Sequence, residues 1–320
     1  MLIPRYWAEA HVKGRAGDRR ITVRRFGWSL VGQAEAEAHA AERAAEALAR
    51  ILAGTELPRR EPKVPYNGAV GVPIREEILA THGSAVITRN AYGAECLNTP
   101  NVLFADIDFA FVPPARTALI AIGLGFVLPI ALGVFFHAFW LAIVGWFAML
   151  LAAYLFAQLR ARLGVPERAA RKRIDAFLRT HTDWLLRVYR TPAGLRLLAM
   201  HRTFEPSEPA VAELFRAVRA DPAYVQMCLR QQCFRARVSA KPWRAGVTTH
   251  LRPRTGVWPI APERLPVRAE WVADYERRAR LYASCRYVTT LGAGRIDAEA
   301  EAVRALHDER CRATSELPIA

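Results

Sequence analysis

The fold is decided by residues 117–159, TALIAIGLGFVLPIALGVFFHAFWLAIVGWFAMLLAAYLFAQL, a stretch of 43 residues without a single Asp, Glu, Lys or Arg. A bilayer core about 30 Å thick needs about 20 apolar residues in a helix, and one helix of this length would reach about 64 Å. We therefore expect two membrane spans, at 117–134 and 138–158, with a turn at 135–137. A helical hairpin buried in a soluble core is the alternative, but such helices seldom run so far without a charge.

The charges around this stretch predict its orientation. Loops that hold Lys and Arg stay on the cytoplasmic side of a membrane. Arg116 precedes the first expected span, and a basic group follows the second: Arg160, Arg162, Arg168, Arg171, Lys172 and Arg173. We therefore expect a bacterial inner-membrane protein with two spans and both termini in the cytoplasm. Glycines in the hairpin allow close helix packing, and the hairpin is also a possible surface for oligomer formation.

Composition leaves the partner open. The chain has 320 residues, 45 of them basic and 30 acidic, for a net charge of +15. Basic residues near a membrane are held by anionic lipid, whereas a basic groove can hold nucleotide or nucleic-acid phosphates. The five cysteines are scattered and odd in number, so we expect free thiols in a cytoplasmic protein. Cys228 and Cys233 have no second ligand pair nearby that would indicate zinc.

The soluble parts read as mixed helix and strand. Residues 4–12 and 20–26 resemble a β-hairpin, 33–54 a helix, 74–83 a short helix, and 101–109 an apolar strand. The expected fold class is an α+β cytoplasmic body with an inserted two-helix transmembrane hairpin. We expect four segments, namely a strand–strand–helix unit, the first part of the α+β core, the hairpin, and the second part of the core with C-terminal helices (1–56, 57–115, 116–160 and 161–320).

Two carboxylates end the apolar strand NVLFADIDF. Side chains two residues apart share a strand face, which places Asp106 and Asp108 on one side with Cα atoms about 6.6 Å apart. That spacing allows both to reach one divalent cation. The plainer interpretation is that two acids mark the point where a buried strand meets water.

Basic residues mark two later regions. In FRARVSAKPWR, residues 234–244, the cations at alternate positions share one strand face, and the expected hairpin at 183–204 contributes further arginines. These cations either pair with water and with acidic strands or form a phosphate-binding floor. The candidate anion-binding residues are Arg187, Arg196, Arg235, Arg237 and Lys241.

The order of VLFADID (102–108), TPAGLRLL (191–198) and FRARVSAKPWR resembles the archaeo-eukaryotic primase–polymerase superfamily. The resemblance implies nucleotidyl transfer with Mg²⁺ or Mn²⁺ held by Asp106 and Asp108. Two positions depart from the family pattern: the histidine of the second motif falls on or near Arg196, and the third strand has no Asp or Glu. The chain also resembles bacterial inner-membrane proteins as a class.

Two functions follow from these patterns. The first is a membrane-anchored, cytoplasm-facing binding or scaffold protein whose basic surface meets an anionic partner, either a lipid headgroup, a nucleotide or a nucleic acid. The alternative is a metal-dependent phosphoryl or nucleotidyl transferase that uses Asp106 and Asp108. The chain has no Walker loop, HExxH, GxSxG or dinucleotide fingerprint, so no catalytic residue is predicted.

Overall fold

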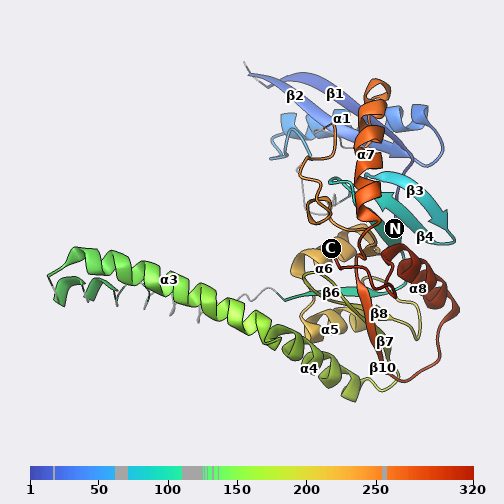
Figure 1. Cartoon of the computed structure of the whole chain (residues 1–320). Helices are drawn as coiled ribbons and strands as arrows, with labels where there is room; N and C mark the ends of the chain where they lie inside the picture. Colours follow the sequence, from blue (N-terminus) through green and yellow to red (C-terminus); the bar gives the residue numbers. More distant parts are fainter. Residues whose placement is uncertain are drawn as a thin grey trace. The chain divides into compact units, whose positions relative to one another are not determined.

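The computed structural model describes residues 1–16, 19–61, 71–109, 125, 127, 129–131, 133–135, 137–253 and 258–320. The chain divides into two units. The first unit comprises residues 1–107 and 177–320, and the second comprises 108–176. The first unit mixes sheets and helices, which confirms the α+β part of the predicted fold class (Figure 1).

The N-terminal segment is the predicted strand–strand–helix motif. Strands β1 (Tyr6–Ala16) and β2 (Arg19–Ser29) pair antiparallel, and helix α1 (Gln33–Leu52) packs on them. The alternation in the second strand buries Ile21 and Val23 against Leu48 of the helix. The small side chains along α1 are buried at spacings of four or three, and the helix can therefore approach the strands closely.

Gly27 is the point of closest approach between β2 and α1. A Cβ atom at this position would lie 2.1 Å from the Ala40 nitrogen and 2.4 Å from the Ala36 carbonyl oxygen. Gly27→Ala is expected to push the helix from the strands and lower the free energy of unfolding by about 1–3 kcal/mol or more. Chemical denaturation of the detergent-solubilised chain measures this.

The matched control for Gly27→Ala is Gly32→Ala, because a Cβ at Gly32 meets nothing within 4 Å. This change at the first residue before α1 should cost less than about 1 kcal/mol. Equal losses in the two variants would show that the contact between strand and helix is not tight.

The first four-stranded sheet joins distant parts of the chain. Its order is β3 (Glu77–His82), β4 (Ala85–Arg89), β5 (Glu95–Thr99) and β9 (Phe234–Arg237), and all neighbours are antiparallel. The residues before and after the apolar stretch therefore share one sheet. The sequence predicted a helix at 74–83, which is wrong, because these residues pair with β4 across a turn at Gly83.

Helix α7 (Leu265–Ala279) is held to this sheet by polar contacts. The Tyr275 hydroxyl donates to the Ala240 carbonyl oxygen at 2.6 Å and lies 2.6 Å from the Ser239 hydroxyl. Arg89 of β4 pairs with Glu276 at 2.5 Å. Figure 1 shows α7 beside this sheet, in agreement with these contacts.

The second four-stranded sheet has the order β10 (Arg286–Gly292), β7 (Leu185–Arg190), β8 (Gly194–Ala199) and β6 (Phe104–Asp108). Helix α8 (Ala298–Cys311) contacts it through charged and aromatic side chains. Helices α5 (Pro209–Val218) and α6 (Pro222–Gln231) follow β8. Tyr224 of α6 donates to the Phe104 carbonyl oxygen at 3.0 Å and accepts from the Arg235 amide, so it links both sheets.

An aromatic group lies at the start of β7. The half-buried ring of His201 contacts Trp184 and Phe204, and its Nδ1 accepts a hydrogen bond from the Leu185 amide. Its Nε2 has no hydrogen-bond partner among the described residues. Burial lowers the pKa of His201 below its ordinary value of 6.5, because the charged form would lose water around it, and this outweighs the opposing effect of Asp183.

This shift predicts a loss of stability in acid. The folded chain keeps His201 neutral. The contribution of His201 to the free energy of unfolding is therefore fully present above pH 6.5, and it declines as the pH falls towards and through the lower pKa of the folded state. Lowering the pH from about 7.5 to about 5.5 should therefore destabilise the wild type more than His201→Gln. Denaturation curves at several pH values measure the difference. If the free energy of unfolding falls equally with pH in the wild type and in His201→Gln, the lowered pKa of His201 is contradicted.

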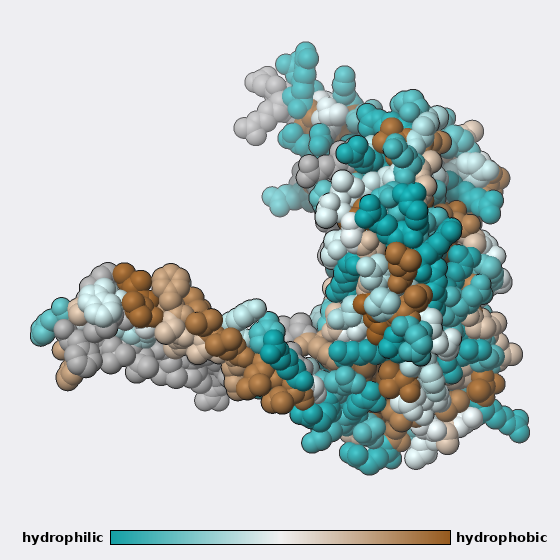
Figure 2. Space-filling view, in the orientation of Figure 1, coloured by the Kyte–Doolittle hydropathy of each residue, from teal (hydrophilic) through white to brown (hydrophobic). Residues whose placement is uncertain are grey.

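In the second unit, helix α3 (Phe139–Arg162) is followed by α4 (Val165–Thr180), whose last residues belong to the first unit. Within the described residues, α3 is the one helix long and apolar enough to cross a membrane, over Ile143–Arg160. The described residues of this window are all exposed or half-exposed. The hydrophobic surface along the second unit is visible in Figure 2.

The predicted first span falls largely outside the described residues, so two spans remain a prediction. Its described part is helical, and the chain turns at His137, where the Ala138 amide donates to the Gly133 carbonyl oxygen at 2.9 Å. A Cβ at Gly145 would lie 3.2 Å from Pro129, and this pair is placed symmetrically about His137. The described residues before the turn therefore lie against α3.

Candidate functional site

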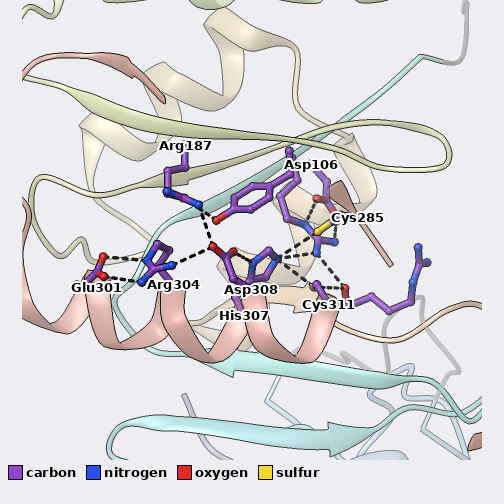
Figure 3. Close-up of polar contacts among 11 residues, drawn as sticks. Asp106, Arg187, Cys285, Glu301, Arg304, His307, Asp308 and Cys311 are labelled. Carbon is purple, nitrogen blue, oxygen red and sulfur yellow. Dashed lines mark hydrogen bonds and ion pairs between the residues drawn. The ribbon is translucent and has the colours of Figure 1, made fainter. Parts of the chain in front are cut away.

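A buried polar cluster lies between α8 and the sheet of β10, β7, β8 and β6 (Figure 3). We call it the α8 cluster. Each of its members is buried or half-buried, and they come from four strands or strand ends and one helix: Asp106, Arg187, Tyr189, Arg196, Cys285, His307, Asp308 and Cys311. Buried polar groups are costly unless they are paired, so the contacts within the cluster define what it can do.

Local structure explains why these side chains meet. His307 and Cys311 are four residues apart on α8, so they share one face of the helix. The N-terminus of α8 is capped by Asp297, whose side chain accepts from the amides of Glu299 and Ala300. Tyr189 stands directly opposite Arg196 in the pairing of β7 with β8. In Figure 3, the α8 side chains point towards the strands.

Asp106 and Arg196 form the ion pair of the cluster. Arg196 Nε lies 2.8 Å from Asp106 Oδ1, and Nη2 lies 3.4 Å from Oδ2. Arg196 Nη1 also donates to the Arg237 carbonyl oxygen at 2.9 Å. Burial alone would lower the pKa of Arg196, but the Asp106 carboxylate raises it above its ordinary value. The arginine is therefore a permanent buried cation.

His307 occupies the centre. Its Nδ1 lies 3.0 Å from Asp308 Oδ1, and the charged carboxylate can only accept, so Nδ1 carries the proton. Burial would lower the pKa of His307, but the Cys311 sulfur and the Asp308 carboxylate raise it above its ordinary value. Nε2 faces three neighbours. These are Arg196 Nη1 at 3.3 Å, Cys311 Sγ at 3.4 Å and Cys285 Sγ at 3.9 Å.

Asp308 is held by two arginines. Arg187 Nη2 lies 2.9 Å and Arg304 Nη1 lies 3.1 Å from Asp308 Oδ2, and Arg304 also pairs with Glu301. Burial would raise the pKa of Asp308, but hydrogen bonds from His307 and Tyr189 lower it below its ordinary value. The carboxylate is therefore charged at neutral pH and fixes the orientation of the imidazole ring.

The predicted anion-binding residues have different partners. Arg187 and Arg196 belong to the α8 cluster, where Asp308 and Asp106 neutralise them. Arg235 forms a buried ion pair with Glu76. Arg237 is half-buried on β9, and the Lys241 ammonium lies 5.3 Å from the centre of the Trp243 ring.

The two predicted metal ligands differ in environment. Asp106 is half-buried and paired with Arg196, whereas Asp108, at the end of β6, is exposed. The metal role of the two acids and the anion role of the cations remain predictions. What the structure adds is that Asp106 and one of the cations lie in contact.

Sequence reasoning missed the residues at the centre of the cluster. The ligand atoms of Cys285, His307 and Cys311 all lie within 4.8 Å of one another, and they are the one group of this kind among the described residues. The signal available was HDERC at 307–311, where a His and a Cys four residues apart share a helix face. Cys285 comes from a different segment, so spacing could not have joined it to them.

Comparison of the chain with known proteins found no matching family model, curated protein or solved structure. The function is therefore argued from the residues and their geometry.

Proposed function

We propose that this protein is anchored in a bilayer by residues 117–158 and binds anionic lipid headgroups through the basic residues that follow. The main support for the membrane anchor is helix α3. It is apolar, and none of its described residues between Ile143 and Arg160 is buried. Leaving so many large apolar side chains in water is unfavourable, and a bilayer removes them from it.

The first unit supports an even number of crossings. Strands β5 and β9 pair in one sheet, from Cys96 opposite Arg237 to Thr99 opposite Phe234. The apolar stretch lies between these two strands in the sequence. One sheet cannot lie on two sides of a membrane. If α3 crosses once, a second crossing must lie between β6 and α3, and 117–134 is the apolar segment available there.

The polar side of α4 supports the headgroup contact and the orientation. Exposed cations lie at the end of α3, at Arg162, and on α4, at Arg168 and Lys172. Each basic residue near an anionic surface contributes about 1 kcal/mol, and such residues stay on the cytoplasmic side. We therefore place the first unit and both termini on the cytoplasmic face of a bacterial inner membrane.

A topology experiment tests the anchor. Reporter domains fused in turn to the N-terminus and the C-terminus should both be active in the cytoplasm. A third fusion, inserted after His137, should be active on the other side. Termini on opposite sides, or a cytoplasmic His137 reporter, would overturn the two-span proposal.

A proteolysis experiment tests the lipid contact. In nanodiscs with anionic lipid, trypsin should cut after Arg168 and Lys172 more slowly than in zwitterionic nanodiscs, and added salt should remove the difference. Arg230, exposed on α6, is the internal control whose cleavage should not depend on the lipid. Equal cleavage of α4 in both lipids would contradict the headgroup proposal.

The transferase alternative has a specific obstacle. A Mg²⁺ or Mn²⁺ ion on Asp106 would have to displace Arg196, which holds that carboxylate at 2.8 Å. Calorimetric titration of the solubilised chain with Mn²⁺ and a nucleoside triphosphate tests it. Metal-dependent nucleotide binding that Asp106→Asn abolishes would favour the transferase, and an absence of binding would remove it.

A further inference from the structure

We propose that Cys285, His307 and Cys311 form a binding site for a thiophilic metal ion, with Zn²⁺ as the ion that fits the charge of the surroundings. The ligand atoms of these three residues lie within 4.8 Å of one another, and all three residues are buried. Thiolate and imidazole are the ligands that Zn²⁺ and Cu⁺ prefer in proteins. This site is independent of membrane attachment.

The spacing of the donor atoms fits a metal. Zn–S bonds of about 2.3 Å and Zn–N bonds of about 2.0–2.1 Å, at tetrahedral or trigonal angles, place S and N about 3.5–3.8 Å apart. His307 Nε2 lies 3.4 Å from Cys311 Sγ and 3.9 Å from Cys285 Sγ. The two observed distances lie on either side of that range.

The histidine is prepared for a metal by its second nitrogen. Metal-binding histidines commonly donate the other ring N–H to a carboxylate, which fixes the tautomer and the ring orientation. His307 Nδ1 makes this contact with Asp308 Oδ1 at 3.0 Å, and Arg187 and Arg304 hold Asp308 in turn. A layer of oriented side chains therefore supports the three donors.

The charges around the site select a divalent ion. Asp106 is neutralised by Arg196, Asp308 by Arg187, and Glu301 by Arg304. If Cys285 and Cys311 are both thiolates, they carry two negative charges that no nearby cation balances. Burying unpaired charges costs free energy. A Zn²⁺ ion brings the sum to zero, whereas Cu⁺ would leave one negative charge.

The immediate neighbours are compatible with this assignment. Arg196 Nη1 would give up its contact with Nε2 but keep its hydrogen bond to the Arg237 carbonyl oxygen. That oxygen also accepts a hydrogen bond from Cys311 Sγ at 3.9 Å. A bound ion would tie the end of α8 to Cys285, just before β10, and its binding would add to the stability of the fold.

Cobalt substitution tests the proposal on the full chain in detergent under reducing conditions. After treatment with a chelator, titration with Co²⁺ should saturate at one ion per chain, with a thiolate-to-cobalt charge-transfer band that Zn²⁺ abolishes. Cys285→Ser and Cys311→Ser should each lose or strongly weaken this band. Cys96→Ser and Cys228→Ser, which change buried thiols elsewhere, should keep it.

If a cysteine variant fails to fold, Asp308→Asn still tests the proposal, because it keeps all three metal-donor atoms. Loss of the carboxylate should weaken Co²⁺ binding about 10- to 100-fold. The proposal is overturned if the reduced chain gives no thiolate band, or if the band persists in the Cys285→Ser, Cys311→Ser double variant. Stoichiometric binding of Cu⁺ with no binding of Zn²⁺ would overturn the choice of ion.

Discussion

Replacement of Leu151 by Arg is expected to prevent stable insertion of α3 into a bilayer. Leu151 lies near the middle of the Ile143–Arg160 window and is 57% exposed. At the centre of an inserted helix Arg costs about 2.5–3.5 kcal/mol, and Leu contributes about 0.5 kcal/mol in the favourable direction. The total change of about 3–4 kcal/mol corresponds to a shift of more than about 100-fold in the insertion equilibrium.

Alkaline carbonate extraction of membranes measures this effect. When the extracted material is floated on a density gradient, the wild type should rise with the lipid. Leu151→Arg should stay below with soluble and aggregated protein, and Leu151→Ala is the matched control that should rise with the lipid. If carbonate releases the wild type, α3 does not span a bilayer. If Leu151→Arg rises with the lipid, Leu151 does not face lipid.

Replacement of Arg235 by Met is expected to lower the free energy of unfolding by about 3–5 kcal/mol, because it leaves a buried carboxylate without its cation. Arg235 and Glu76 pair with side chains only 5% and 3% exposed. Thr88 also donates to Glu76 at 2.7 Å, but a hydroxyl does not neutralise the charge. Chemical denaturation of the solubilised chain measures the loss.

The second variant in this test is Glu76→Gln, Arg235→Met, which removes both charges. It should recover much of the stability, since a buried pair contributes little compared with the penalty of an unpaired ion. Arg216→Met, at an exposed position of α5, is the control and should change stability by less than about 0.5 kcal/mol. A loss below about 1 kcal/mol in Arg235→Met would mean that Glu76 does not depend on this cation, and the predicted phosphate role of Arg235 would gain support.

The regular elements with a clear local pattern were predictable. Strands β1 and β2 alternate, α1 has alanines at helical spacing, and the turn before α3 interrupts an apolar run. Each of these signals depends on neighbours a few residues apart. Residues 74–83 were mistaken for a helix because their charged and apolar residues suit a helix locally, while the pairing of β3 with β4 decides the outcome.

Asp106 shows why the ion-pair partners of charged residues could not be predicted from the sequence pattern. Its carboxylate could have met a metal ion, water or any of several cations, and the strand order places Arg196, 90 residues away, beside it. Arg235 was expected on a common cationic face, and Glu76, 159 residues away, neutralises it instead. A period of two residues states which side chains share a strand face, but not which strand lies opposite.

The amino-acid sequence by itself determined that a long uncharged stretch interrupts an α+β body, because the cost of placing apolar side chains in water depends only on composition and length. Only the tertiary structure decided that the two sides of this stretch share one sheet and that Cys285 meets His307 and Cys311. The physical reason is that these contacts join segments far apart in the chain. Sheet order and the packing of α8 bring them together, and neither leaves a local signature.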